Sequence, residues 1–161
     1  IIFMIKIINF CVLVLLISSC AMKANQNKYI LNNYFIDINL TNNDRYNTLL
    51  KFELSKINMD SINDKKIISL ETDLKFSNIS TLSLNGLKPL YEMKGLISFK
   101  LVDENEKVLD QGKLFSKINY GSVSSLYGKD QNEKFVKERI VQRLSLKLLN
   151  KIKLVLNKIE N

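Results

Sequence analysis

Residues 68 to 77 read ISLETDLKFS and carry the pattern that decides the fold. Apolar and polar side chains alternate along the whole stretch, which is the period of a β-strand with one dry and one wet face. The dry series runs Ile68, Leu70, Thr72, Leu74 and Phe76. So strict an alternation predicts an antiparallel or mixed sheet covered on one side, because the strands of fully buried parallel sheets are apolar on both faces.

The segments around this strand predict three more strands and two helices. A shorter alternation predicts a strand over residues 34–40, and an apolar stripe from Tyr46 to Ile57 predicts a helix that Asn42 or Asn43 caps. A loop over residues 78–89 follows, and then two strands, at about 92–102 and 107–120, that form a hairpin. Apolar residues at steps of three and four predict a final helix of about 30 residues over 129–161.

These elements predict an α+β fold with the order β-α-β-β-β-α. We expect a single domain in which two helices pack on a small mixed or antiparallel four-stranded sheet. Its core should bring Leu70, Leu74 and Phe76 against the apolar stripes of the helices, at Leu49, Leu54, Leu144 and Leu148. Composition agrees with one core, since the 161 residues are 46% apolar and 25% charged, with five Gly and one Pro.

The chain lacks the residues that most enzyme sites require. It has no His, and its two Cys stand at positions 11 and 20, which excludes imidazole catalysis and a zinc cluster. The sequence contains no Gly-x-Ser-x-Gly elbow, no Ser-x-x-Lys motif and no Gly-rich phosphate loop. We therefore expect a protein that is not an enzyme and that holds no metal or cofactor.

The first twenty residues have the pattern of a bacterial lipoprotein signal. Lys6 precedes an apolar run over residues 7–17, which is too short to span a bilayer but has the length of a secretory core segment. The run ends in a lipobox-like sequence, Leu16, Ile17, Ser18, Ser19 and Cys20. We expect translation to start at Met4, residues 1–19 to be the signal peptide, and Cys20 to be lipidated. The alternative is an ordinary signal peptide or short anchor with an incidental Cys.

Residues 20–33 are polar and aperiodic, and they predict a tether between the lipid and a domain over residues 34–161. Ala21 occupies the position where an acidic residue usually retains lipoproteins in the inner membrane, so we expect the periplasmic face of the outer membrane. The net charge of +8 favours an anionic partner such as a phosphorylated glycolipid. Nucleic acid is not expected, because a lipidated periplasmic protein meets little of it. The basic excess concentrates in residues 129–161, where solvation of the outer helix face is the alternative explanation.

The order of elements and the C-terminal stretch resemble the LptE family, in the form found in alphaproteobacteria. The resemblance is carried by the hairpin strand with Gly112, the strand end at 117–120, the lead-in at 125–128, and a helix running through Ile140, Leu144 and Leu148. It implies a non-enzymatic outer-membrane lipoprotein that plugs the LptD barrel, assists its assembly and helps deliver lipopolysaccharide to the outer leaflet. The alternative is an accessory lipoprotein of another envelope lipid-transport or barrel-assembly machine.

Direct binding of lipopolysaccharide would need cations for its phosphates. Lys88 and Lys94 are the first candidates, because Gly86 and Pro89 favour a turn that projects them. Lys113 and Lys117 on the last predicted strand are the second. The alternative is that all four lysines only keep the surface soluble.

Overall fold

The computed structural model describes residues 33–56, 65–81, 90–121 and 125–160. Within these ranges the chain forms β1 (Tyr34–Leu40), α2 (Arg45–Ser55), β2 (Lys66–Thr81), β3 (Leu90–Val102), β4 (Val108–Gly121) and α3 (Leu126–Glu160). The strands form one sheet in the order β1-β2-β3-β4, with β1 parallel to β2 and the other pairs antiparallel. The predicted α+β class, the mixed four-stranded sheet and the element order are confirmed.

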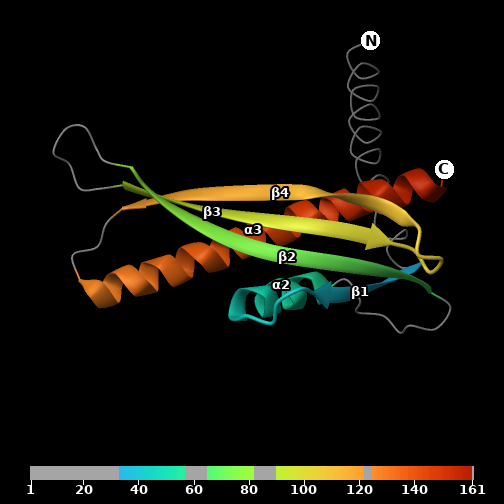
Figure 1. Ribbon diagram of the computed structural model, residues 1–161, viewed down its shortest axis with the longest axis horizontal. Coiled ribbons are helices and arrows are strands. Elements are labelled where there is room, and N and C mark those ends of the chain that lie inside the picture. The colour runs from blue at the N-terminus through green and yellow to red at the C-terminus, as the bar shows by residue number, and fades with distance from the viewer. Residues whose placement is uncertain (1–32, 57–64, 82–89, 122–124, 161) are drawn as a thin grey trace, which may run out of the picture.

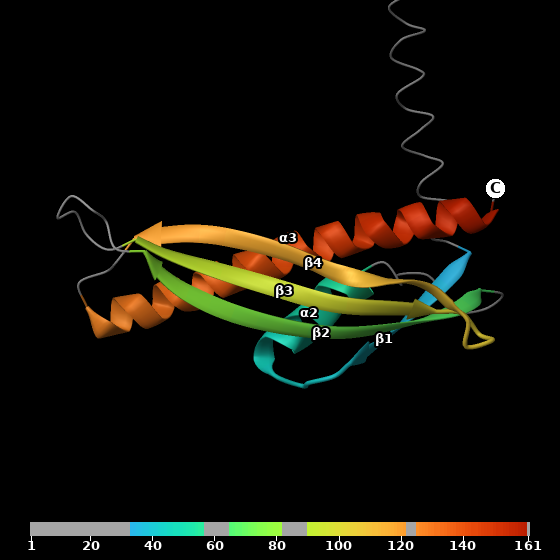
Figure 2. The same ribbon diagram turned by 45° about the horizontal axis from the view of Figure 1, so that its top comes forward.

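Both helices lie on the same side of the sheet, with α3 running along its length and α2 beside it (Figure 1). Figure 2 shows the same two layers from a turned view, with the other face of the sheet uncovered. The expected core residues meet between the layers: Leu70, Leu74, Leu54, Leu144 and Leu148 are buried, and Phe76 and Leu49 pack against them. The alternation at residues 68–77 therefore identified the covered face correctly.

The cap of α2 differs from the prediction. Asp44, and neither Asn42 nor Asn43, is the N-cap, and its carboxylate accepts hydrogen bonds from the backbone N–H groups of Tyr46 at 2.9 Å and Asn47 at 2.8 Å. The position next to the helix has the extended backbone that brings a side-chain oxygen to these two N–H groups. The Asn47 side chain also accepts a bond from the Leu74 N–H at 3.3 Å, which fastens α2 to β2 just beyond the end of β1.

Two element boundaries also move outward. β2 continues to Thr81, so Asn78 lies in a strand that pairs with β3 and not in the predicted loop. The partner strand decides this, since β3 begins at Leu90 and completes the ladder to that point. α3 begins at Leu126, where the Ser125 side chain accepts a bond from the Gly128 N–H at 3.0 Å. Among the described residues, no helix is long and apolar enough to cross a membrane.

The sheet has two distinct ends. The start of β1, the turn between β3 and β4, and the C-terminal end of α3 lie together at one end, which we call the tether end (Figure 1). At the opposite end, the rings of Tyr91 and Tyr120 stack with their centroids 5.5 Å apart. The Tyr120 hydroxyl lies 3.3 Å from the Glu133 carboxylate and so ties β4 to α3. The protonated hydroxyl donates to this carboxylate, and burial and the Glu133 charge raise the Tyr120 pKa above its usual value.

The helix α3 leaves no room for a side chain at Gly95 of β3. A Cβ atom at this position would lie 2.4 Å from Cγ2 of Ile140 and 3.1 Å from Cδ1 of Leu144, and both of those side chains are fully buried. Ile140 is branched at Cβ and has few alternative rotamers in a helix, so it cannot move aside easily. Gly95 is therefore required by the contact between the layers.

We expect Gly95→Ala to destabilise the domain by about 1 to 3 kcal/mol, the usual cost of overpacking a core. Gly121→Ala is the matched control, because a Cβ at Gly121 has no neighbour within 4 Å. Thermal unfolding of both variants measures the difference. Equal melting temperatures for the two variants would contradict the close contact.

Candidate functional site

The structure places three of the predicted lysines on the uncovered face of the sheet. Lys94 lies on β3, and Lys113 and Lys117 lie on β4. Lys94 and Lys117 are direct partners across the two strands, and Lys113 lies opposite Ser98. The other predicted positions, Cys20 and Lys88, lie outside the described residues.

An exposed aromatic ring stands at the centre of these lysines. Phe115 lies on β4 between Lys113 and Lys117 and is 56% exposed. The Lys94 amino group lies 5.3 Å from the centre of its ring. Lys147, from α3, lies 5.7 Å from the same ring and donates a hydrogen bond of 2.8 Å to the Phe115 carbonyl at the free edge of β4. We call Lys94, Lys113, Phe115, Lys117 and Lys147 the Phe115 patch.

The Phe115 patch has a large excess of positive charge. Glu92 lies 3.1 Å from the Lys117 amino group. Among the described residues, no carboxylate lies within ion-pair distance of Lys94, Lys113 or Lys147. Elsewhere on the same face lysines are paired, as Lys75 is with Asp73 at 2.9 Å. The patch therefore differs from its surroundings in having four lysines and one carboxylate.

This arrangement does not favour stability. Like charges directly opposite each other on neighbouring strands are destabilising, and Lys94 and Lys117 are such a pair. Lysines on an edge strand do protect against pairing with other chains, which is the structural explanation for Lys113 and Lys117. That explanation does not cover Lys94, because β3 is an inner strand. Four amino groups around a half-exposed ring are suited to an anion that also has an apolar part.

The sequence pattern missed two members of the patch. Phe115 occupies a wet-face position of the predicted last strand, and a large ring between two lysines at i−2 and i+2 was a usable signal. Lys147 has no such signal, because it reaches the patch from α3 only after the helix has packed along β4.

A hollow lies at the tether end of the sheet. It has a volume of about 270 Å³ and is lined by Tyr34, Ile67, Asp103, Glu104 and Ile159, among others. Burial and the charge of Glu160 raise the Tyr34 pKa above its usual value. No group of three or more His, Cys, Asp or Glu side chains among the described residues could hold a metal ion.

Comparison with known proteins identifies the fold but no family. No protein-family model and no curated protein sequence matches the chain. A protein described as a lipoprotein from Caulobacter crescentus has a similar structure, with a TM-score of 0.61, 13% identity, and coverage of 83% of this chain and 96% of that one. A minor lipoprotein from Acinetobacter baumannii gives 0.56 at 17% identity, covering 75% and 90%. The rare lipoprotein B of Shewanella oneidensis gives 0.58 at 14% identity, covering 80% and 100%.

Proposed function

We propose that this chain is an outer-membrane lipoprotein of the LptE type, anchored by lipid on Cys20 at the periplasmic face. It plugs an LptD-like β-barrel, assists assembly of the barrel, and helps deliver lipopolysaccharide to the outer leaflet. It works without catalysis or a cofactor. The fold supports this proposal, since the three similar structures named above are all described as lipoproteins and match over most of their length.

The observation that carries the proposal is the Phe115 patch. Lipopolysaccharide presents phosphate groups next to acyl chains, and the patch presents four lysines, of which only Lys117 has a carboxylate partner among the described residues, next to an exposed ring. Lysine binds phosphate as a point charge, and the four lysines come from three different elements that the fold holds rigidly together. Such binding should weaken as salt is added, because exposed charges are screened over about 8 Å at physiological ionic strength.

The uncovered sheet face also suits a polar barrel interior. Beyond the patch, the charged side chains of this face pair with each other, as Lys75 does with Asp73 and, more loosely, Lys100 with Glu71 at 3.9 Å. The lumen of a large outer-membrane barrel is polar, so a plug that turns this face to the wall loses little hydration. An obligate interface of two soluble proteins would be more apolar.

We expect the double variant Lys94→Ala with Lys117→Ala to bind lipopolysaccharide at least about tenfold more weakly, since losing one charged hydrogen bond already costs about 1.5 kcal/mol or more. Lys75→Ala with Lys100→Ala is the matched control, because it removes the same charge from the same face at lysines outside the Phe115 patch. Titration of each protein with lipopolysaccharide measures the affinities. If the parent and the K94A/K117A protein bind lipopolysaccharide with equal affinity, the Phe115 patch is not the binding site.

Cys20→Ala should leave an unprocessed precursor without lipid, since the thiol that takes the diacylglycerol is gone. Labelling cells with radioactive palmitate measures this, with the parent chain as the positive control. Palmitate in the C20A protein would show that the lipobox interpretation is wrong.

A photocrosslinker placed at Lys94 or Lys117 should capture a large outer-membrane β-barrel in growing cells. Depletion of the protein should lower the amount of assembled barrel and make the cells sensitive to bulky hydrophobic antibiotics. If the crosslinker captures only inner-membrane transporter subunits, the plug proposal is wrong and the accessory-lipoprotein alternative takes its place.

A further inference from the structure

The outer face of the helix layer carries large apolar side chains that the fold leaves uncovered. Along α3, Phe135 is 56% exposed, Leu146 is 62% exposed and Leu154 is 60% exposed. Phe52 of α2 is 60% exposed and lines an open groove between the helices together with Leu49 and Gln142. Leu146 follows Gln142 by one helical turn on the same face of α3, so it continues the apolar surface of the groove along that helix.

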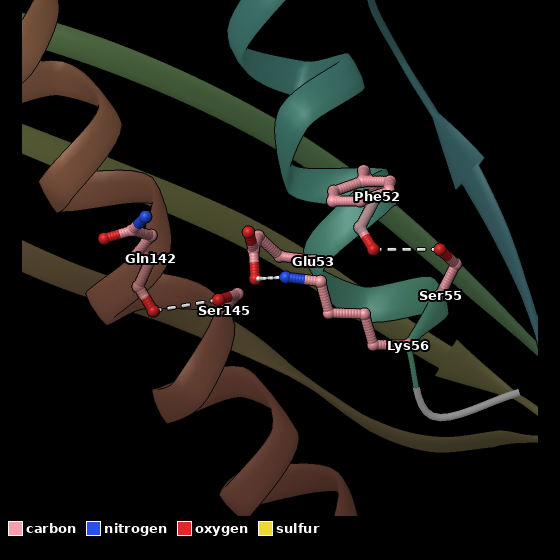
Figure 3. A network of polar contacts seen from close by, with 6 residues as sticks. All are labelled: Phe52, Glu53, Ser55, Lys56, Gln142 and Ser145. Atoms are coloured by element: carbon pink, nitrogen blue, oxygen red, sulfur yellow. Dashed lines mark hydrogen bonds and ion pairs between the residues drawn. The ribbon is translucent and has the colours of Figure 1, made fainter. Parts of the chain in front are cut away.

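The two helices form a continuous layer beneath this surface. Figure 3 shows α2 and α3 side by side, with Glu53 and Ser145 in the space between them. Glu53 pairs with Lys56 on its own helix at 2.7 Å, and Arg45 of α2 bonds Glu138 of α3 at 2.6 Å. The Glu53 and Glu138 carboxylates next to the groove are therefore already paired. Neither of them neutralises the basic side chains of the outer face.

The helix that carries most of this surface is strongly basic. From Lys134 to Lys158, α3 carries one acidic residue, Glu138, against the bases Lys134, Lys137, Arg139, Arg143, Lys147, Lys151, Lys153 and Lys158. Lys147 and Lys151 reach back to β4, whereas Arg139 and Arg143 are exposed beside Phe135 and Leu146. The Arg139 guanidinium lies 5.2 Å from the Phe135 ring and so adds charge directly at an apolar residue.

Solvation of the outer face by charged residues does not account for this surface. A face that only meets water needs no row of half-exposed Phe and Leu, and a polar barrel lumen offers such a row nothing to pack against. Apolar side chains between basic ones on the outer face of a helix are the pattern of interfacial binding, in which the ring and alkyl groups enter the headgroup region and the bases attract anionic lipid.

We propose that the outer face of the helix layer, built on Phe52, Phe135, Leu146 and Leu154 with Arg139 and Arg143, docks on an anionic phospholipid bilayer. This inference rests on the lipid anchor of the proposed function and concerns the anchored domain before it enters the barrel, because a domain seated in the lumen does not touch the bilayer. The thirteen residues from Ala21 to Asn33 span at most about 45 Å when extended, so an anchored domain stays within reach of the bilayer. Docking by the helix layer leaves the Phe115 patch, on the opposite side of the sheet, free to bind its own ligand.

The absence of Trp makes the orientation measurable. Leu146→Trp places a single fluorophore on the proposed face, and Ile79→Trp places one on the uncovered sheet face, where Ile79 is 50% exposed. Each full-length chain is expressed, purified and reconstituted into vesicles of phosphatidylglycerol and phosphatidylethanolamine whose acyl chains are brominated. We expect L146W to show a blue-shifted emission that brominated lipid quenches severalfold more strongly than it quenches I79W.

Charge variants and lipid composition test the electrostatic part. Arg139→Glu with Arg143→Glu, combined with L146W, should lose most of the quenching, and so should pure phosphatidylcholine vesicles or added salt. Lys75→Glu with Lys100→Glu is the matched control on the sheet face and should lose none. Folding of every variant is checked by thermal unfolding, so that a lost signal is not misread.

The outcomes separate this inference from the lipid anchor. If the protein binds the vesicles but L146W is not quenched, or is quenched no more than I79W, the docking face is wrong and the lipid anchor stands. If the purified chain proves to carry no lipid and its L146W emission is still quenched by anionic vesicles, the lipid anchor is wrong and the docking face stands. A photocrosslinker at Leu146 that captures only a β-barrel, with no quenching in vesicles, would assign the face to the barrel.

Discussion

The contact between α3 and β3 at Gly95 is the constraint on which the rest of the structure depends. It allows the fully buried Ile140 and Leu144 to lie directly on the sheet, so one long helix covers β3 and β4. The described residues include no Cys that could form a disulfide and no cluster of side chains that could hold a metal ion. Packing alone therefore holds this part of the chain together. The position of Lys147 beside Phe115 and the outward direction of Leu146 both follow from how α3 is seated.

Covering only one face of the sheet gives the molecule two unlike surfaces. The uncovered sheet face carries several ion pairs besides exposed apolar residues such as Ile79, and the Phe115 patch is its basic exception. The outer helix face carries half-exposed apolar residues, and α3 has eight bases and one acid from Lys134 to Lys158. A domain of this kind can present one surface to a membrane and the other to a phosphorylated ligand, because the exposed apolar residues of the helices and the Phe115 ring lie on opposite sides of the sheet.

The candidate site depends on register as much as on residue type. Lys94 and Lys117 become neighbours because β3 and β4 pair antiparallel with Lys94 opposite Lys117, and a shift of one residue would send one of them to the core side. The same register puts Phe115 opposite Leu96, so an apolar strip crosses the basic cluster on the uncovered face. The edge position of β4 leaves the Phe115 carbonyl free for Lys147.

The elements, their order and the buried face could be predicted from the sequence, because period-two alternation at residues 68–77 and apolar steps of three and four in the helices are local patterns. The sequence also indicated Lys94, Lys113 and Lys117, although without their relative positions. Only the tertiary structure decided the extension of β2 through Asn78, the capping of α2 by Asp44, the need for Gly95, and the arrival of Lys147 at Phe115. Each of these depends on contacts between segments far apart in the chain or on the exact backbone geometry at one residue, and neither is encoded in a local pattern of polarity.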